Sequence, residues 1–199
     1  MAQKPRKVLV FGMDGADWDI MQPLIDKGDM PAMARLQREG AWGPLASTIH
    51  PHSPTAWASF LTGSNPGMHG IFDFVHRKPG TYEMEIFHTK LRGGKSLWQV
   101  LSQAGVRCGV MNVPMTHPPE KVNGYFVSGA FTTNAFAKFT YPLTLIDEIK
   151  GVLGHSYTVR TLHSTHCIPS NLIICMLYIP HQVYLEPSNL LSRRILIAL

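Results

Sequence analysis

The chain has 199 residues, of which 45% are apolar and 16% are charged. This composition excludes a disordered chain and suits one globular domain with a core of its own. The formal net charge is +5, but Lys and Arg are scattered along the sequence, so no nucleic-acid partner is expected. The three cysteines form no C-x-x-C pair, which argues against a disulfide framework and against a cysteine zinc site.

The sequence shows neither a signal peptide nor a membrane span. The apolar run at residues 8–13 ends at once in Asp14, and the most apolar run, residues 172–180, is much shorter than the ~20 residues that cross a bilayer. We therefore predict a cytoplasmic protein without a membrane partner. The sequence does not indicate an oligomeric state.

The first part of the chain alternates apolar strand patterns with capped helix patterns. The predicted strands are residues 7–13, 42–49, 106–113 and 125–128, and the predicted helices run from Trp18 to Gly28, from Pro31 to Gly40, from Ser53 to Gly63, over 96–104 and over 142–150. Residues 64–70 are predicted to form a loop. Such alternation is typical of an α/β fold with a mostly parallel sheet flanked by helices.

The character of the sequence changes near residue 150. Residues 151–199 contain neither Lys nor Asp, and their one acidic residue is Glu186. The surface of a folded domain needs more charge than this. We therefore divide the chain into residues 1–150 and an atypical, irregular tail at 151–199. The tail is either out of frame with the natural gene, or an unusual and poorly ordered extension.

Two residues stand where chemistry can occur. Asp14 follows the first strand, and the C-terminal end of a strand is where ligands bind in open α/β sheets; a carboxylate there binds a cation or caps the next helix. Ser53, followed by Pro54, predicts a helix N-cap. A hydroxyl at a helix N-terminus also lies beside free N–H groups that hold phosphate. Since the chain has no G-x-S-x-G elbow, we expect a metal to activate this serine.

For two further motifs we favour a structural role over a catalytic or binding one. His69 lies between the glycines of the segment N-P-G-M-H-G (65–70) and either binds a metal or, as we favour, forms a hydrogen bond to the backbone. The run G-G-K-S at 93–96 lacks the spacing of a phosphate loop, so we interpret it as a turn followed by a helix cap.

Residues 8–15 (VLVFGMDG), 30–36 (MPAMARL) and 53–74 (SPTAWASFLTGSNPGMHGIFDF) together carry a family resemblance. They resemble the type I phosphodiesterase/nucleotide pyrophosphatase family, in its prokaryotic branch within the alkaline phosphatase superfamily. The resemblance continues through residues 96–98 and 109–115. The block T-G-x-N-P-G-x-H-G-I at a fixed distance from Asp-Gly is its most specific part.

The resemblance implies an alkaline-phosphatase-like catalytic domain, with residues 1–150 as its N-terminal part. It implies two divalent metal ions, usually zinc, and a small phosphoester or nucleotide substrate. Asp14 corresponds to a metal ligand, and Ser53 to the nucleophile, which also binds metal. Thr55 is the alternative nucleophile, less favoured because Ser53 keeps the family's distance to Thr62 and Gly63.

The sequence departs from the family in the remaining site residues. Phe74 stands near the position of a phosphate-supporting Asn in the eukaryotic branch, and the later Asp-x-x-x-His and Asp-His-Gly ligand motifs are absent. Catalytic zinc takes about three protein ligands. We therefore expect an incomplete metal site in a truncated chain that is weakly active or inactive. The alternatives are a non-catalytic phosphate- or nucleotide-binding α/β module and a broken gene product; phosphomonoester and phosphodiester substrates both stay open.

Overall fold

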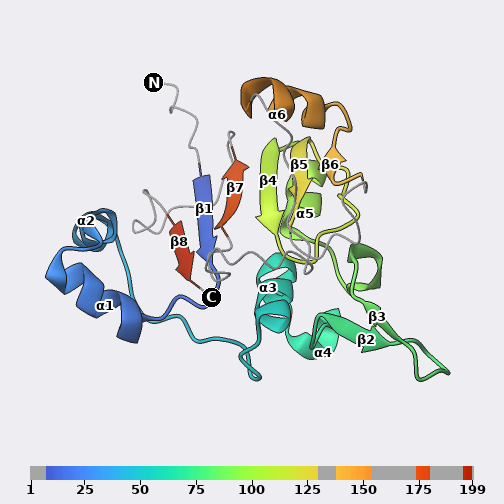
Figure 1. Cartoon of the computed structure of the whole chain (residues 1–199), viewed down its shortest axis with the longest axis horizontal. Coiled ribbons are helices and arrows are strands. Elements are labelled where there is room, and N and C mark those ends of the chain that lie inside the picture. Colours follow the sequence, from blue (N-terminus) through green and yellow to red (C-terminus); the bar gives the residue numbers. More distant parts are fainter. Residues whose placement is uncertain (1–7, 130–137, 154–173, 180–194, 199) are drawn as a thin grey trace.

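The computed structural model describes residues 8–129, 138–153, 174–179 and 195–198, and a six-stranded sheet is their centre (Figure 1). The strands lie in the order β6-β5-β4-β7-β1-β8. Their bounds are β1 Val8–Met13, β4 Cys108–Val113, β5 Gly124–Ser128, β6 Thr140–Tyr141, β7 Ile174–Ile179 and β8 Ile195–Ala198. The predicted α/β class is therefore confirmed.

The sheet is mixed rather than uniformly parallel. β1 pairs with β8, and β4 with β5, in parallel, so that β1, β4, β5 and β8 all run in one direction. β7 lies antiparallel between β1 and β4, and β6 lies antiparallel to β5. The predicted mostly parallel arrangement therefore holds for strand direction but not for every pairing.

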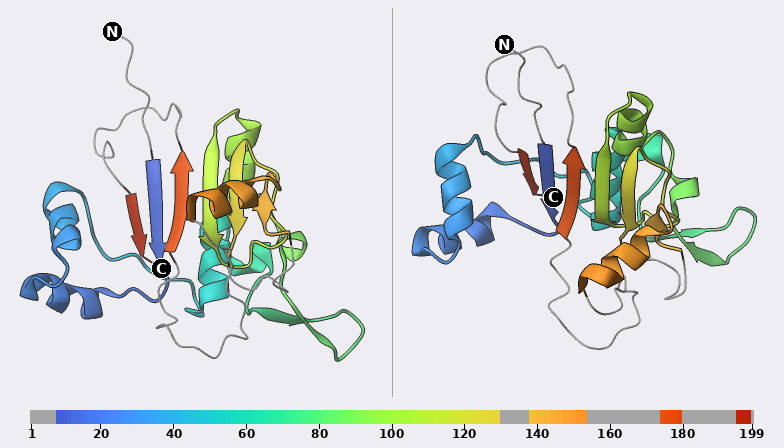
Figure 2. Two further views of the ribbon diagram at one scale, coloured as in Figure 1. Left: turned by 45° about the horizontal axis from the view of Figure 1, so that its top comes forward. Right: turned by 90° about the horizontal axis from the view of Figure 1, so that it is seen from above.

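Helices cover both faces of the sheet (Figure 2). Their bounds are α1 Trp18–Lys27, α2 Pro31–Glu39, α3 Ser53–Thr62, α4 Pro66–His69, α5 Leu97–Gln103 and α6 Leu145–Leu153, with a 3-10 turn, η1, at Thr89–Leu91. α3 and α5 share one apolar core with β1, β4 and β5, whose buried members include Val10, Trp57, Leu61, Trp98, Leu101, Val110 and Phe126. α6 lies on the face opposite α5. No helix of the described residues is long and apolar enough to span a membrane.

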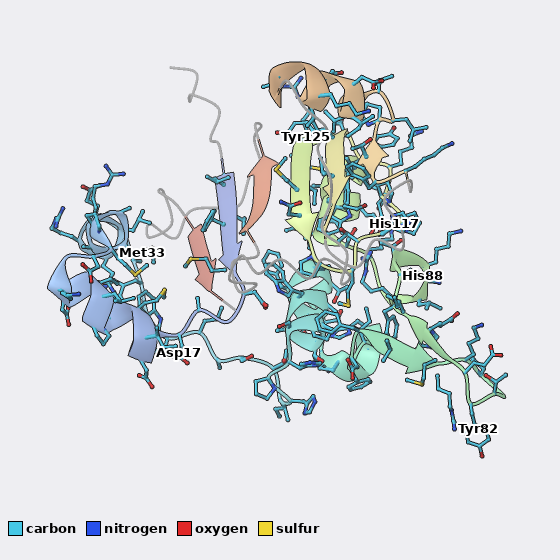
Figure 3. The ribbon with its side chains drawn as sticks, in the orientation of Figure 1. Asp17, Met33, Tyr82, His88, His117 and Tyr125 are labelled. Carbon is cyan, nitrogen blue, oxygen red and sulfur yellow. The ribbon has the colours of Figure 1, made fainter. Side chains whose placement is uncertain are left out.

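α1 and α2 form a separate helical pair beside the β8 edge of the sheet (Figure 1). Their contact is a small apolar cluster, in which Met13 of β1 meets Met21, Ile25 and Met33; Met33 is labelled in Figure 3. Gly28 ends α1 with a φ of 91°, a backbone conformation that glycine adopts without steric cost. The helix ends predicted from the sequence at Gly28, Gly40 and Gly63 are confirmed.

Two local predictions are corrected, and one hairpin is added. Residues 42–49 form an exposed connection between α2 and α3 instead of a strand, because they have no neighbouring strand among the described residues. Residues 64–70, predicted as loop, contain the short helix α4. The hairpin of β2 (Val75–Arg77) and β3 (Met84–Ile86) was not predicted, since its strands are only three residues long.

The C-terminal stretch contributes directly to the sheet. α6 continues past the predicted boundary at residue 150 and ends at Leu153. β7 and β8 both come from the tail that we predicted to be irregular, and β1 lies between them. The other residues of this tail lie outside the described residues, and the division of the chain at residue 150 stays a prediction.

Candidate active site

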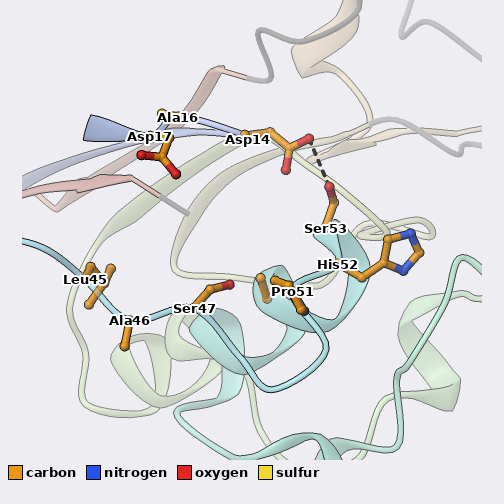
Figure 4. Close-up of a pocket in the computed structure, with 11 residues that line it drawn as sticks. Asp14, Ala16, Asp17, Leu45, Ala46, Ser47, Pro51, His52 and Ser53 are labelled. Atoms are coloured by element: carbon orange, nitrogen blue, oxygen red, sulfur yellow. Dashed lines mark hydrogen bonds between the residues drawn. The ribbon is translucent and has the colours of Figure 1, made fainter. Parts of the chain in front are cut away.

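The two residues singled out in the sequence meet at the C-terminal end of β1. Asp14 directly follows this strand, and Ser53 is the first residue of α3. The Ser53 Oγ donates a hydrogen bond of 3.1 Å to the Asp14 Oδ2 (Figure 4). The fold therefore brings a hydroxyl and a carboxylate together at the sheet edge where ligands bind in α/β proteins.

Ser53 lies one position further into its helix than the sequence suggested. His52 is the N-cap of α3, with extended backbone (φ −128°, ψ 136°), and the first helical hydrogen bond runs from the Ala56 N–H to the His52 carbonyl. Pro54 has no N–H to satisfy, which suits the first turn of a helix. Because Ser53 is not the cap, its hydroxyl is available to Asp14, and its own N–H and that of Thr55 precede the first helical bond.

The second oxygen of Asp14 is held by a residue that sequence reasoning missed. The Trp57 Nε1 donates a hydrogen bond of 3.1 Å to the Asp14 Oδ1. Trp57 follows Ser53 by four residues, so both side chains leave the same face of α3. The four-residue spacing between Ser53 and Trp57 was the available signal in the sequence, but an apolar residue at that helix position is equally typical of the core.

The Asp14–Ser53 pair lies in a cleft of about 260 Å³. Figure 4 shows its lining, which consists of Asp14, Gly15, Ala16, Asp17, Leu45, Ala46, Ser47, Pro51, His52, Ser53 and Ala56. Asp17 caps α1 by accepting a hydrogen bond of 2.8 Å from the Asp19 N–H. This lining contains two carboxylates and neither Lys nor Arg, so within the described part of the chain an anionic ligand would rely on the α3 N-terminus.

Thr55, the alternative nucleophile, is placed differently. Its side chain is fully buried, and its Oγ1 donates a hydrogen bond of 3.1 Å to the Phe72 carbonyl. Of these two residues, Ser53 lines the cleft and Thr55 does not. The geometry thus favours Ser53 over Thr55 as the reactive group.

His69 has the structural role favoured from the sequence. Its ring is buried; the Nδ1 accepts a hydrogen bond of 3.1 Å from the Ile71 N–H, and the Nε2 lies 2.9 Å from the Ser59 Oγ. Burial, and then the positive charge of Arg92, lower the pKa of His69 below its ordinary value. A neutral imidazole with both nitrogens engaged fixes α4 against α3 and has no nitrogen left for a metal.

Comparison with known proteins places this geometry in a family. Residues 8–166 match the type I phosphodiesterase/nucleotide pyrophosphatase family, so the match covers β1, α3 and the cleft. The chain belongs to this family. Members of this family are phosphoric ester hydrolases that act on small phosphoester or nucleotide substrates. No curated protein and no solved structure matches the chain.

The metal ions that the resemblance implies fit this site only in part. A carboxylate and a hydroxyl, as offered by Asp14 and Ser53, suit a hard or borderline cation. Catalytic zinc, however, takes about three protein ligands. Across residues 8–129, 138–153, 174–179 and 195–198, no group of three or more His, Cys, Asp or Glu side chains could hold a metal ion. The described residues do not complete a metal site, and we assign no chemical step to one.

Proposed function

We propose that this family member hydrolyses phosphodiester or pyrophosphate bonds with Ser53 as its nucleophile. The observation that carries the proposal is the 3.1 Å hydrogen bond from the Ser53 Oγ to the Asp14 Oδ2 at the first turn of α3. A serine hydroxyl is a weak nucleophile unless a neighbouring group takes up its proton or its charge. Asp14 is in place to accept that proton.

The reaction follows from this arrangement in two displacements. The Ser53 oxygen attacks phosphorus as its proton passes to Asp14, and the bond from phosphorus to the leaving oxygen breaks. The leaving oxygen takes up a proton from solvent and departs as an alcohol or phosphate. The phosphorylated serine is then cleaved by water, which restores the hydroxyl. The N-terminus of α3 supports this chemistry, because free N–H groups and the helix dipole stabilise the negative phosphoryl oxygens.

The two divalent ions predicted from the family pattern remain part of the proposal. Asp14 and Ser53 would be ligands to one of them, and two ligands hold a zinc ion weakly. We therefore expect slow turnover by this chain, with Ser53 as the residue on which turnover depends.

The test is hydrolysis of bis(4-nitrophenyl) phosphate, with and without added zinc, by the wild type and by Ser53→Ala. Ser47→Ala is the matched control, because Ser47 lines the same cleft but is not the hydroxyl bonded to Asp14. The proposal expects the Ser53 variant to lose turnover and the Ser47 variant to keep it. Turnover that survives Ser53→Ala would refute the assignment. Phosphate or nucleotide binding without any hydrolysis would favour the non-catalytic module instead.

A further inference from the structure

Trp57 and Ser53 together hold both oxygens of one carboxylate. The Ser53 Oγ bonds the Asp14 Oδ2, the Trp57 Nε1 bonds the Asp14 Oδ1, and both distances are 3.1 Å. Hydrogen bonds to both oxygens leave the carboxylate one preferred rotation about its terminal torsion, which is otherwise broad. α3 therefore determines how Asp14 presents an oxygen to the serine.

The indole of Trp57 is itself held in place by packing. Its side chain is fully buried in the main core, where the ring of Phe60 packs edge-on at a centroid distance of 5.9 Å. The ring also lies directly over the backbone of β1, because a Cβ added at Gly12 would come within 2.5 Å of the Trp57 Cη2. Gly12 lies two residues before Asp14, so the same short stretch of β1 receives the ring and carries the carboxylate.

We propose that Trp57 is a positioning residue, whose indole N–H fixes the Asp14 carboxylate so that its other oxygen faces the Ser53 hydroxyl. The inference rests on the proposed function of Asp14 and Ser53. Without the N–H, the carboxylate can rotate, and the Ser53 hydroxyl loses a fixed hydrogen-bond partner. Partners that orient metal-ligating side chains typically change activity by about 10–100-fold when removed, and we expect an effect of that size for Trp57.

The chain contains a matched control for this role. Trp98 is also buried in the main core, with 1% of its surface exposed, and it packs edge-on against Phe126. The Trp98 Nε1 has no hydrogen-bond partner within the described residues. Trp57→Phe and Trp98→Phe therefore remove the same atoms from the same core, but only the first removes a bond to Asp14.

The kinetic test compares hydrolysis of bis(4-nitrophenyl) phosphate by the wild type, Trp57→Phe and Trp98→Phe. We expect kcat to fall by about 10–100-fold in the first variant with KM within about threefold. We expect Trp98→Phe to keep kcat within about threefold of the wild type. Equal loss of kcat in both variants would assign Trp57 a packing role only and overturn the proposal.

A spectroscopic arm tests the contact without relying on turnover. In protein labelled with ¹⁵N-tryptophan, Asp14→Ala removes the acceptor and leaves both indoles in place. We expect the Trp57 N–H resonance to shift while that of Trp98 stays unchanged. A Trp57 resonance that does not respond would overturn the positioning role. If the wild type has no turnover but the resonance responds, the proposed function fails and the contact stands.

Discussion

Gly12→Ala is the substitution whose outcome depends most directly on the contact between β1 and α3. The new Cβ would lie 2.5 Å from the Trp57 Cη2 and 3.1 Å from its Cζ3, whereas ordinary contacts begin near 3.4 Å. The ring must therefore move by roughly 1 Å, and a fully buried side chain has no space for that movement. Overpacking of this kind costs about 1–3 kcal/mol, so we expect the variant to lose that much stability.

Gly109→Ala in β4 provides the comparison. A Cβ at Gly109 would collide with the Tyr125 ring, but Tyr125 is 42% exposed, so its side chain can move toward solvent. We expect the free energy of unfolding of this variant to lie within about 0.5 kcal/mol of that of the wild type.

Urea denaturation followed by tryptophan fluorescence measures the free energy of unfolding of both variants. In thermal unfolding, we expect Gly12→Ala to have a Tm about 2–12 °C below that of the wild type. Equal stability of the two variants would refute the close contact between Gly12 and Trp57.

Three further predictions concern charges and the metal. Glu120→Ala should lower the free energy of unfolding by about 3–5 kcal/mol in urea denaturation, because it leaves the buried Arg92 guanidinium without its partner at 2.6 Å. Asp29→Ala, which removes the exposed Lys27–Asp29 pair, should lower it by less than about 1 kcal/mol. Equal losses in the two variants would contradict this prediction. Burial, and then His88, lower the pKa of His117 (Figure 3), so the unfolded state takes up a proton as the pH falls through about 6.5 while the folded state does not. The free energy of unfolding should therefore decrease below that pH and decrease less steeply in His117→Gln; parallel curves would exclude His117 as the cause. Calorimetric titration should find fewer than two tightly bound zinc ions, since no group of three or more His, Cys, Asp or Glu side chains within the described residues could hold a metal ion.

The local signals of the sequence located most of the elements that surround the site. The apolar run before Asp14 predicted β1, and Ser-Pro with Gly63 placed α3 to within one residue. These features depend on neighbours in the chain, such as the fixed φ of proline and the left-handed backbone of glycine, and are therefore visible in a single sequence.

Features that depend on distant partners could not be predicted in this way. Residues 42–49 have strand-like composition, but a strand also needs a neighbour, and none is present for them among the described residues. β7 lies between β1 and β4, a pairing that no local pattern specifies. The bond from Trp57 to Asp14 joins positions 43 residues apart, so an apolar helix position gave no sign of it.

The most direct measurement of the central claim is capture of the phosphorylated enzyme. The protein is mixed with bis(4-nitrophenyl) phosphate, quenched in acid and digested, and the peptide that contains Ser53 is identified by mass spectrometry. The account predicts a phosphoryl ester on Ser53, and none at Thr55, whose buried hydroxyl bonds the Phe72 carbonyl. An ester on Thr55, or nitrophenol release with no modified serine at any quench time, would contradict it.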